Sequence, residues 1–397
     1  MFRILLSLFL ATVLLSCGSE PAAVPAAATN LIADLQDYFV PDRRVARLDV
    51  ELALQDNGAL ALVGETTLPA AKDSLLEVLA AEGYNEIDDQ VLEMPSAALG
   101  EVTFALARHS VVNLRSEKGH SQELATQVLL GTPLRVLKQD EEWYFARCPD
   151  GYLAWVHGGE IVRMTAKELE AWQDADRVVF TANSGFTYSG PTPESEQLGD
   201  LVAGGILVRE AVRGDYTAVV YPDDRKGFVP NSALQAFDKW LSERELSFPL
   251  TQAIAFQQIG KPYFWGGTSP KAMDCSGFTK TVYWQQGLII PRDASQQVHA
   301  GVAVEYDDEL NGLEPGDFLF FGRFREDGSE KITHVGIYLG DGAFTHSGSD
   351  NGANKVQQLL PDRPDYVAHR RESLMRARRL QPGGPGIQAV AEHGWYW

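Results

Sequence analysis

The sequence predicts an α+β chain of several domains: a small N-terminal α+β unit, two small β-barrels and a larger C-terminal α+β domain. Three observations support this prediction. The chain has 397 residues, 45% of them hydrophobic, which is enough for more than one core. One order of short strands and turns occurs twice in its middle part. Helical and strand patterns occur together on both sides of that repeat.

Charge and cysteine usage exclude several classes of function. The formal net charge of −20 argues against a nucleic-acid partner, because phosphates are bound by clustered Lys and Arg and the sequence has no long basic run. Cys17, Cys148 and Cys275 lie far apart without CxxC or Cys/His spacing, so neither a disulfide framework nor a zinc site is expected. Cys148 lies where a strand enters a turn and is expected to be a packing residue. No cofactor is implied.

The first 17 residues, "MFRILLSLFLATVLLSC", have the features of an export signal: a basic residue and a short apolar run. Their end, "LLSC", resembles the bacterial lipobox, in which cleavage precedes the cysteine and the thiol is acylated. We therefore expect residues 1–17 to be a lipoprotein signal peptide and Cys17 to anchor an exported protein to a membrane of the cell envelope. The alternative is ordinary secretion, with cysteine at this position by chance. Residues 18–42, rich in Ala and Pro at first, are predicted to be a linker.

A small α+β domain is predicted for residues 43–100. Two alternating stretches, "RLDVELALQ" and "ALALVGETT", flank Asp56-Asn57-Gly58, which is a hairpin turn signal. Residues 69–83 have helical spacing and end at Gly83. This domain contains no catalytic constellation, so the sequence does not indicate its role.

The middle of the chain contains an internal repeat. Residues 123–156 and 195–230 share one order of features: an apolar stretch with a glycine, a strand, a turn, a Tyr-bearing strand, a Pro-Asp turn and a final strand. Short strands at this spacing predict two small barrels, at residues 105–165 and 175–240. The first copy closes with "DGYLAWV" and resembles bacterial Src-homology-3-type domains. The second copy matches less well, because it lacks the tryptophan pair of the first.

The C-terminal domain, residues 245–385, carries a cysteine at a predicted helix start. "LTQAIAFQQIG" has the pattern of a helix that ends at Gly260, and "DCSGFTKTVYWQQG" that of a second helix ending at Gly287. Cys275 falls in the first turn of this second helix. The positive end of a helix dipole stabilises an anion, so this position is expected to lower the thiol pKa.

Two histidines provide candidate proton acceptors for this thiol. "KITHVGIYLGDGAFTHSG" reads as two strands joined at Gly340-Asp341-Gly342, with His334 and His346 at similar distances from the turn. Hairpin pairing should bring the two imidazoles together. In that arrangement His334 would accept the Cys275 proton and His346 would orient the ring of His334. The alternative is that one or both histidines are satisfied strand residues.

Six motifs of this domain resemble one known family. "PYFWGG", "DCSGF", "PRDASQQ", "LEPGDFLFFG", "HVGIYLGDG" and "FTHSG" occur in the order and approximate spacing of the NlpC-type cell-wall peptidases, over residues 250–380. The resemblance implies a papain-like α+β catalytic domain, with Cys275 as nucleophile, His334 as base and His346 as third polar member. It places Tyr263 beside the nucleophile, where it would help to bind an oxyanion or act as a packed aromatic.

The order of domains narrows the expected substrate. Two such barrels before this catalytic domain resemble the γ-D-glutamyl-L-diamino-acid endopeptidases, which cut peptidoglycan stem peptides with a free N-terminal L-Ala during wall turnover or recycling. The resemblance places Asp293, Ser276, Glu117 and Tyr152 at the amine site. A buried ammonium needs carboxylates and other acceptors, which an N-blocked peptide would leave unpaired. The alternatives are a solvated loop charge for Glu117 and a surface aromatic for Tyr152.

Two other functions are compatible with the sequence. One is an amidase or crosslink endopeptidase on the same scaffold that acts on intact wall. The other is a non-catalytic, wall-binding lipoprotein. We expect a monomer, and the sequence does not distinguish diaminopimelate from lysine as the diamino acid.

Overall fold

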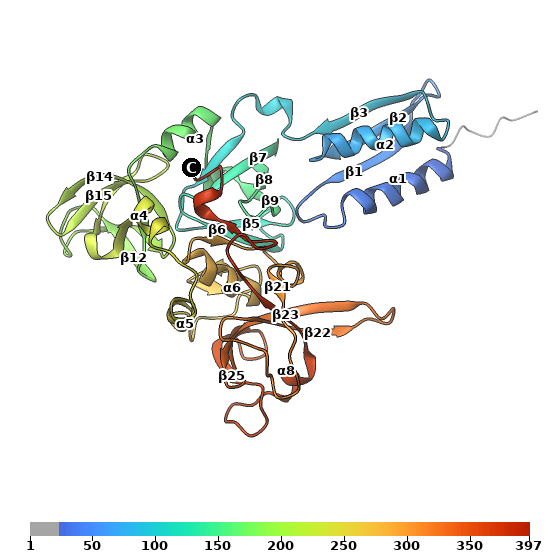
Figure 1. Cartoon of the computed structure of the whole chain (residues 1–397). Coiled ribbons are helices and arrows are strands. Elements are labelled where there is room, and N and C mark those ends of the chain that lie inside the picture. Colours follow the sequence, from blue (N-terminus) through green and yellow to red (C-terminus); the bar gives the residue numbers. More distant parts are fainter. Residues whose placement is uncertain (1–23) are drawn as a thin grey trace, which may run out of the picture. The chain divides into compact units, whose positions relative to one another are not determined.

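The computed structural model describes residues 24–397. By their contacts these residues form two units: residues 24–41 with 47–93, and residues 42–46 with 94–397. Figure 1 labels the elements of both. Among residues 24–397, none of the helices has the length and apolar character that a membrane crossing requires. Cys17 and the predicted signal peptide lie outside the described residues.

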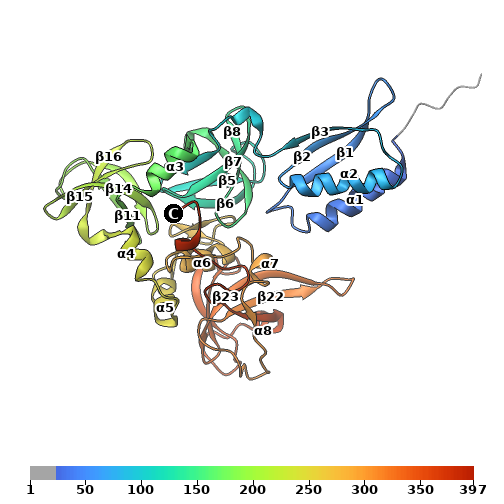
Figure 2. The same ribbon diagram turned by 45° about the horizontal axis from the view of Figure 1, so that its top comes forward.

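The first unit is a three-stranded sheet with two helices. β1 (Leu48–Leu54) pairs antiparallel with β2 (Leu60–Thr66), and β2 pairs parallel with β3 (Ile87–Glu93). The crossover between β2 and β3 contains α2 (Pro69–Ala81), as the parallel pairing requires. Figure 2 shows α1 (Ala26–Phe39) and α2 side by side along this sheet.

Part of the predicted linker at residues 18–42 is helical, so that prediction is wrong for residues 26–39. Pro25 occupies the N-cap position of α1, and the helix buries Ala28 and Ile32 on one face. Alanine has the highest helix propensity, and proline is tolerated at a helix start. The same Ala/Pro composition that suggested an extended linker therefore suits the first turns of an amphipathic helix.

Two seven-stranded antiparallel sheets follow, and they have the same strand order. In the first the order is β10-β4-β7-β8-β9-β5-β6, and in the second, read from its other edge, it is β17-β11-β14-β15-β16-β12-β13. Each strand of the second sheet occupies the same position as the strand of the first sheet whose number is lower by seven. The sequence repeat is therefore also a repeat of sheet topology. The strands are β4 (Phe104–Ala107), β5 (Val111–Arg115), β6 (Leu124–Leu129), β7 (Pro133–Asp140), β8 (Trp143–Arg147), β9 (Leu153–His157), β10 (Ile161–Met164), β11 (Arg177–Phe180), β12 (Ser184–Tyr188), β13 (Gln197–Val202), β14 (Ile206–Arg213), β15 (Tyr216–Val220), β16 (Lys226–Pro230) and β17 (Leu234–Ala236).

The C-terminal part of the chain packs helices against a six-stranded sheet of order β21-β26-β22-β23-β24-β25. Its core joins Phe278 and Val282 of the helix α6 to Val335 and Ile337 of β23, all fully buried. This packing fixes the start of α6 over the sheet. The elements are α5 (Phe248–Phe256), α6 (Cys275–Trp284), α7 (Ala294–Gln297), α8 (Ala368–Ser373), β21 (Val302–Ala303), β22 (Phe318–Phe324), β23 (Glu330–Gly340), β24 (Ala343–Gly348), β25 (Ala353–Gln358) and β26 (Leu374–Arg379).

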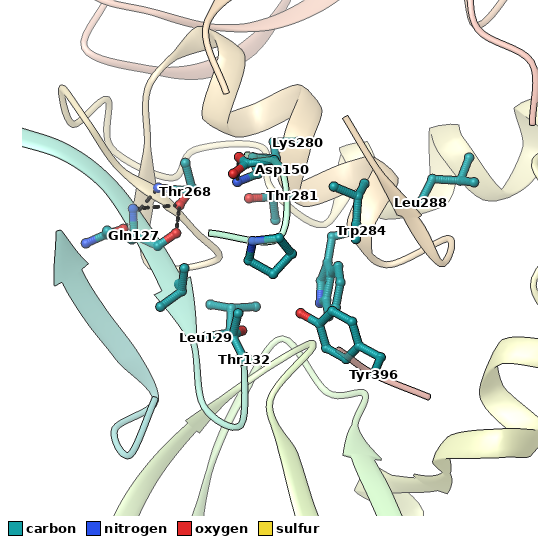
Figure 3. Close-up of a pocket in the computed structure, with 13 residues that line it drawn as sticks. Gln127, Leu129, Thr132, Asp150, Thr268, Lys280, Thr281, Trp284, Leu288 and Tyr396 are labelled. Carbon is teal, nitrogen blue, oxygen red and sulfur yellow. Dashed lines mark hydrogen bonds and ion pairs between the residues drawn. The ribbon is translucent and has the colours of Figure 1, made fainter. Parts of the chain in front are cut away.

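Hydrogen bonds between Thr268 and Gln127 join the C-terminal part to the first seven-stranded sheet. The Thr268 hydroxyl donates to the Gln127 carbonyl at 2.7 Å, and the Thr268 N–H donates to the Gln127 side-chain oxygen at 3.0 Å. Figure 3 shows this pair beside a pocket closed by Tyr396 and Trp284. Tyr396 is 1% exposed, so the C-terminal tail, whose role the sequence does not indicate, helps to cover the junction.

Candidate active site

Cys275 is the first residue of α6, and an acidic residue caps that helix. The Asp274 carboxylate accepts hydrogen bonds from the N–H groups of Gly277 at 2.7 Å and Gly266 at 3.0 Å. A Cβ at Gly277 would lie 1.9 Å from the carbonyl oxygen of Gly267, so only glycine fits there. The motif "DCSG" thus holds the helix start tightly against the preceding loop.

The thiol of Cys275 is not acidic in this state. Burial and the neighbouring Asp274 carboxylate raise the pKa of Cys275 to about 12, against the weaker opposite effect of the Val335 and Ser276 N–H groups. The expectation that the helix start lowers this pKa is therefore wrong for the resting protein. Cys275 is only 7% exposed, and desolvation of a thiolate outweighs the helix dipole. The thiol is protonated at rest and needs a base.

The hairpin of β23 and β24 brings the two histidines together, as predicted. His334 Nε2 lies 2.8 Å from His346 Nδ1. On the next strand, β25, the Gln357 side-chain oxygen lies 2.6 Å from His346 Nε2. The Val335 N–H is hydrogen-bonded to Cys275, so the thiol lies beside the strand that carries His334.

These contacts fix the tautomers of both rings. The Gln357 oxygen only accepts, so His346 Nε2 carries the proton and the Nδ1 of a neutral His346 is an acceptor. His334 then donates from Nε2, which leaves its Nδ1 with a free lone pair. Burial and the adjacent ring lower the pKa of His334 well below 6.5, and burial also lowers the pKa of His346. A neutral His334 with a free Nδ1 is able to accept a thiol proton.

A buried ion pair, not identified from the sequence, supports the helix start. Arg292 is 1% exposed, and its guanidinium donates to the Asp274 carboxylate at 2.6 and 3.2 Å and to the Ser276 hydroxyl at 3.0 Å. It also donates to Thr126 of β6 at 3.1 Å. The sequence feature that could have identified Arg292 is its place in the motif "PRDASQQ", directly before Asp293. Arg292 thus links the catalytic helix to the first seven-stranded sheet.

A cavity of about 500 Å³ contains Cys275, Ser276 and Asp293. Part of its wall comes from β6 and from the turn before β9, which carries Tyr152, and the Tyr152 hydroxyl donates to Asp293 Oδ2 at 3.2 Å. Three of the predicted substrate-binding residues, on two domains, therefore share one cavity. The remaining lining residues are Arg44, Ser116, Glu123, Leu124, Ala125, Trp265, Gly266, Asp274, Arg292, Ala294, Ser295, Lys331, Ile332 and Thr333.

Two of the predicted site residues, Glu117 and Tyr263, are not among the residues that line this cavity. Glu117 is exposed, and the acidic residue that its loop contributes to the cavity is Glu123, whose carboxylate accepts from Trp265 Nε1 at 2.6 Å. Tyr263 lies near Cys275 and Asp274, and burial, together with these two neighbours, raises its pKa. The prediction named Glu117 from its place in "NLRSEKGH", whereas the acidic residue in the cavity lies six positions further along, directly before β6.

Comparison with known proteins agrees with this geometry. Residues 260–373 match the NlpC/P60 family, and residues 114–161 match the bacterial dipeptidyl-peptidase Sh3 domain. A γ-D-glutamyl-L-lysine dipeptidyl-peptidase of Bacillus subtilis is 30% identical over 232 residues, which cover 56% of this chain and 72% of that protein. An enzyme of the same name from Bacillus cereus is 26% identical over 348 residues, 83% of this chain and 92% of that protein.

Solved structures share the fold. An NlpC/P60 family protein of Bacillus cereus superposes with a TM-score of 0.60 at 22% identity, covering 70% of this chain and all of that one. An NlpC/P60 endopeptidase of Photobacterium damselae superposes with a TM-score of 0.52 at 14% identity, covering 92% of this chain and 84% of that one. At these identities the likeness concerns the fold alone.

Proposed function

Because the chain belongs to the NlpC/P60 family of cysteine peptidases, we propose that it cleaves peptidoglycan stem peptides that carry a free N-terminal L-Ala. The bond cut is the one between γ-D-Glu and the diamino acid. The names of the two Bacillus relatives, γ-D-glutamyl-L-lysine dipeptidyl-peptidases, support this bond. A peptidase that releases a dipeptide must recognise the N-terminus two residues before the cleavage point.

The observation that carries the proposal is the contact between Tyr152 and Asp293 in the cavity that contains Cys275. The Tyr152 hydroxyl lies 3.2 Å from Asp293 Oδ2, so a residue of the turn before β9 limits the cleft beside a carboxylate. A carboxylate with a hydroxyl beside it suits a substrate ammonium, whereas an N-acyl group would leave both without a partner. Ser276, the residue after Cys275, lines the same cavity.

The reaction would proceed through a thioester. The Cys275 thiol transfers its proton to Nδ1 of His334 as its sulfur attacks the γ-carbonyl of D-Glu. The N–H of Cys275 and the Tyr263 hydroxyl are the donors proposed for the oxyanion. The His334 proton then passes to the departing amine of the diamino acid. Water next attacks the thioester, with His334 as base, and regenerates the thiol.

Other parts of the chain would have supporting roles. Residues 245–385 form the catalytic domain in this proposal, residues 105–165 close one end of its cleft, and residues 175–240 form the second Src-homology-3-type domain. Acylation of Cys17 would hold the protein at a membrane of the cell envelope, close to its substrate. Replacement of Cys17 by Ala should release the protein from the membrane fraction, and its retention there would contradict this part.

A set of defined stem peptides tests the function. L-Ala-γ-D-Glu-L-Lys and its diaminopimelate counterpart should each yield L-Ala-γ-D-Glu, detected by mass spectrometry, while their N-acetylated forms should react poorly. The Cys275→Ala variant is the inactive control. Equal cleavage of free and acetylated peptides, or release of fragments from intact sacculi alone, would favour an amidase or crosslink endopeptidase instead.

A further inference from the structure

The residue that contacts Asp293 most closely is an arginine from the far end of the chain. Arg44 precedes β1 and lies in the short segment 42–46, which belongs to the same compact unit as the catalytic domain. Its Nη1 donates to Asp293 Oδ2 at 2.7 Å and to the Ser295 hydroxyl at 2.9 Å. Asp293 Oδ2 is also the atom that accepts the Tyr152 hydroxyl. A cation therefore already occupies the side of Asp293 where a substrate ammonium would bind.

Contacts on both sides hold the segment in this place. The Leu153 N–H, one residue after Tyr152, donates to the Arg44 carbonyl at 2.7 Å. The Gln296 side chain donates to the Asp42 carboxylate at 2.7 Å. Arg44 also lines the cavity that contains Cys275. The backbone is thus fixed to the first seven-stranded sheet and to α7 independently of the Arg44 side chain.

We propose that Arg44 is a resident cation of the amine site, which a substrate ammonium must displace from Asp293. This inference rests on the proposed function and adds a residue that sets the affinity for free-amine peptides. Both cations seek the same carboxylate oxygen, and only one of them can lie within hydrogen-bond distance of it on that side. A substrate without a free amine cannot displace Arg44 and gains nothing at this end of the cleft.

The exchange leaves Arg44 with a partner. Its Nε and Nη2 donate to the two oxygens of Asp42 at 2.8 Å each, and this pairing does not involve Asp293. The Arg44 side chain is 38% exposed, so the freed Nη1 would reach water. Displacement therefore costs one charged contact and one hydrogen bond, without burying an unpaired charge. An ammonium held by Asp293 and Tyr152 offsets that loss.

The test measures binding to the inactive Cys275→Ala protein by calorimetry, with L-Ala-γ-D-Glu-L-Lys and its N-acetyl form as probes. Addition of Arg44→Gln should tighten binding of the free-amine peptide roughly 3- to 10-fold, the range of a partly exposed ion pair. Binding of the N-acetyl peptide should not change. In the active enzyme the same substitution should lower KM for the free-amine peptide by more than it changes kcat.

Arg209→Gln is the matched control. Arg209 lies on β14 and forms an exposed ion pair with Asp176, so the substitution removes the same charge away from the cavity and should leave both affinities unchanged. Arg44→Ala provides a second variant, and urea unfolding checks that both remain folded. If the Cys275→Ala protein that retains Arg44 binds the free-amine peptide more tightly than the N-acetyl peptide, the proposed function holds. Unchanged or weaker binding of the free-amine peptide by both Arg44→Gln and Arg44→Ala would then overturn the inference alone. If the protein that retains Arg44 shows no preference for the free amine, both the proposed function and the inference are overturned.

Discussion

The side-chain oxygen of Gln357 lies 2.6 Å from Nε2 of His346 and completes a chain of hydrogen bonds that ends at His334. All three side chains are buried, so bulk solvent does not compete for these hydrogen bonds. Because the glutamine oxygen cannot donate, the direction of each hydrogen bond follows from it. Gln357 is therefore a positioning residue, which acts on the reacting atoms through two imidazoles.

Replacement of Gln357 by Leu should lower kcat by about 10-fold or more, with a smaller change in KM. The His346 Nε2 proton would lose its acceptor, and the tautomer that leaves Nδ1 of His334 free would no longer be favoured. Gln357→Glu keeps an acceptor and adds a charge, which should raise the pKa of His346 and shift the acid limb of the pH–rate profile to higher pH. Steady-state kinetics across pH measure both effects.

Gln358→Leu is the control for this pair, since Gln358 is the next residue of β25 and its side chain points to the opposite face of the strand. It should change neither kcat nor the position of the acid limb. Equal pH profiles for the wild type and Gln357→Glu would mean that Gln357 only fills space.

Asp274→Asn should make the fold less stable and the Cys275 thiol more acidic. Removal of the carboxylate leaves Arg292 as a buried cation without its partner, which should reduce the free energy of unfolding by about 3–5 kcal/mol. The same carboxylate raises the pKa of Cys275, so its loss should lower that pKa. Urea unfolding measures the first effect. The pH dependence of iodoacetamide labelling at Cys275 measures the second.

Cys148 is the internal control for labelling, because it is fully buried and burial raises its thiol pKa. It should remain unlabelled in both folded proteins. A labelling profile at Cys275 that does not move towards lower pH in Asp274→Asn would show that the Asp274 charge does not govern this thiol.

Glu123→Gln should raise KM for free-amine peptides a few-fold and leave kcat nearly unchanged. Glutamine can still accept the hydrogen bond from Trp265 Nε1, so the substitution removes the charge from the cavity and keeps this contact. The lost attraction between the Glu123 carboxylate and a substrate ammonium is modest, about 1 kcal/mol, as for other solvent-accessible ion pairs. Glu117→Gln is the matched control on the same loop. A larger effect from Glu117 than from Glu123 would restore the assignment made from the sequence.

The local parts of the site were predictable from the sequence. The Gly340-Asp341-Gly342 turn fixes which residues of β23 and β24 face each other, so His334 and His346 could be paired without a structure. Asp274 precedes an apolar pattern of helical period, which places Cys275 at a helix start. Each of these inferences depends on residues close together in the sequence.

Contacts between distant segments could not be predicted in this way. Arg44 and Asp293 are 249 residues apart, and nothing in the sequence sets their meeting. In the register of β24 and β25, His346 pairs with Lys355, and Gln357 pairs with Phe344 and reaches His346 diagonally. Asp350-Asn351-Gly352 is a hairpin signal between these strands, but a turn signal alone does not show which side chain of β25 will bind His346. The pKa of Cys275 was predicted in the wrong direction because the helix dipole is visible in a sequence, whereas the burial of Cys275 in the core of the C-terminal domain is not.

Acid should destabilise the folded protein below pH 6.5, the ordinary pKa of histidine. Burial lowers the pKa values of His334 and His346, so below this pH the unfolded chain binds protons that the folded chain does not. The free energy of unfolding therefore falls as pH decreases, and this stability is fully present only above pH 6.5. His393 contributes with the same sign. Urea unfolding between about pH 7 and about pH 5 measures the slope.

His346→Gln separates the histidine pair from other titrating groups. A glutamine at this position can accept from His334 and donate to Gln357, so it preserves both hydrogen bonds without a titratable ring. The slope of unfolding free energy against pH should decrease by up to about 1.4 kcal/mol per pH unit, the contribution of one proton. An unchanged slope would mean that His346 binds its proton equally well in the folded and unfolded chains, which is incompatible with a buried, neutral ring between His334 and Gln357.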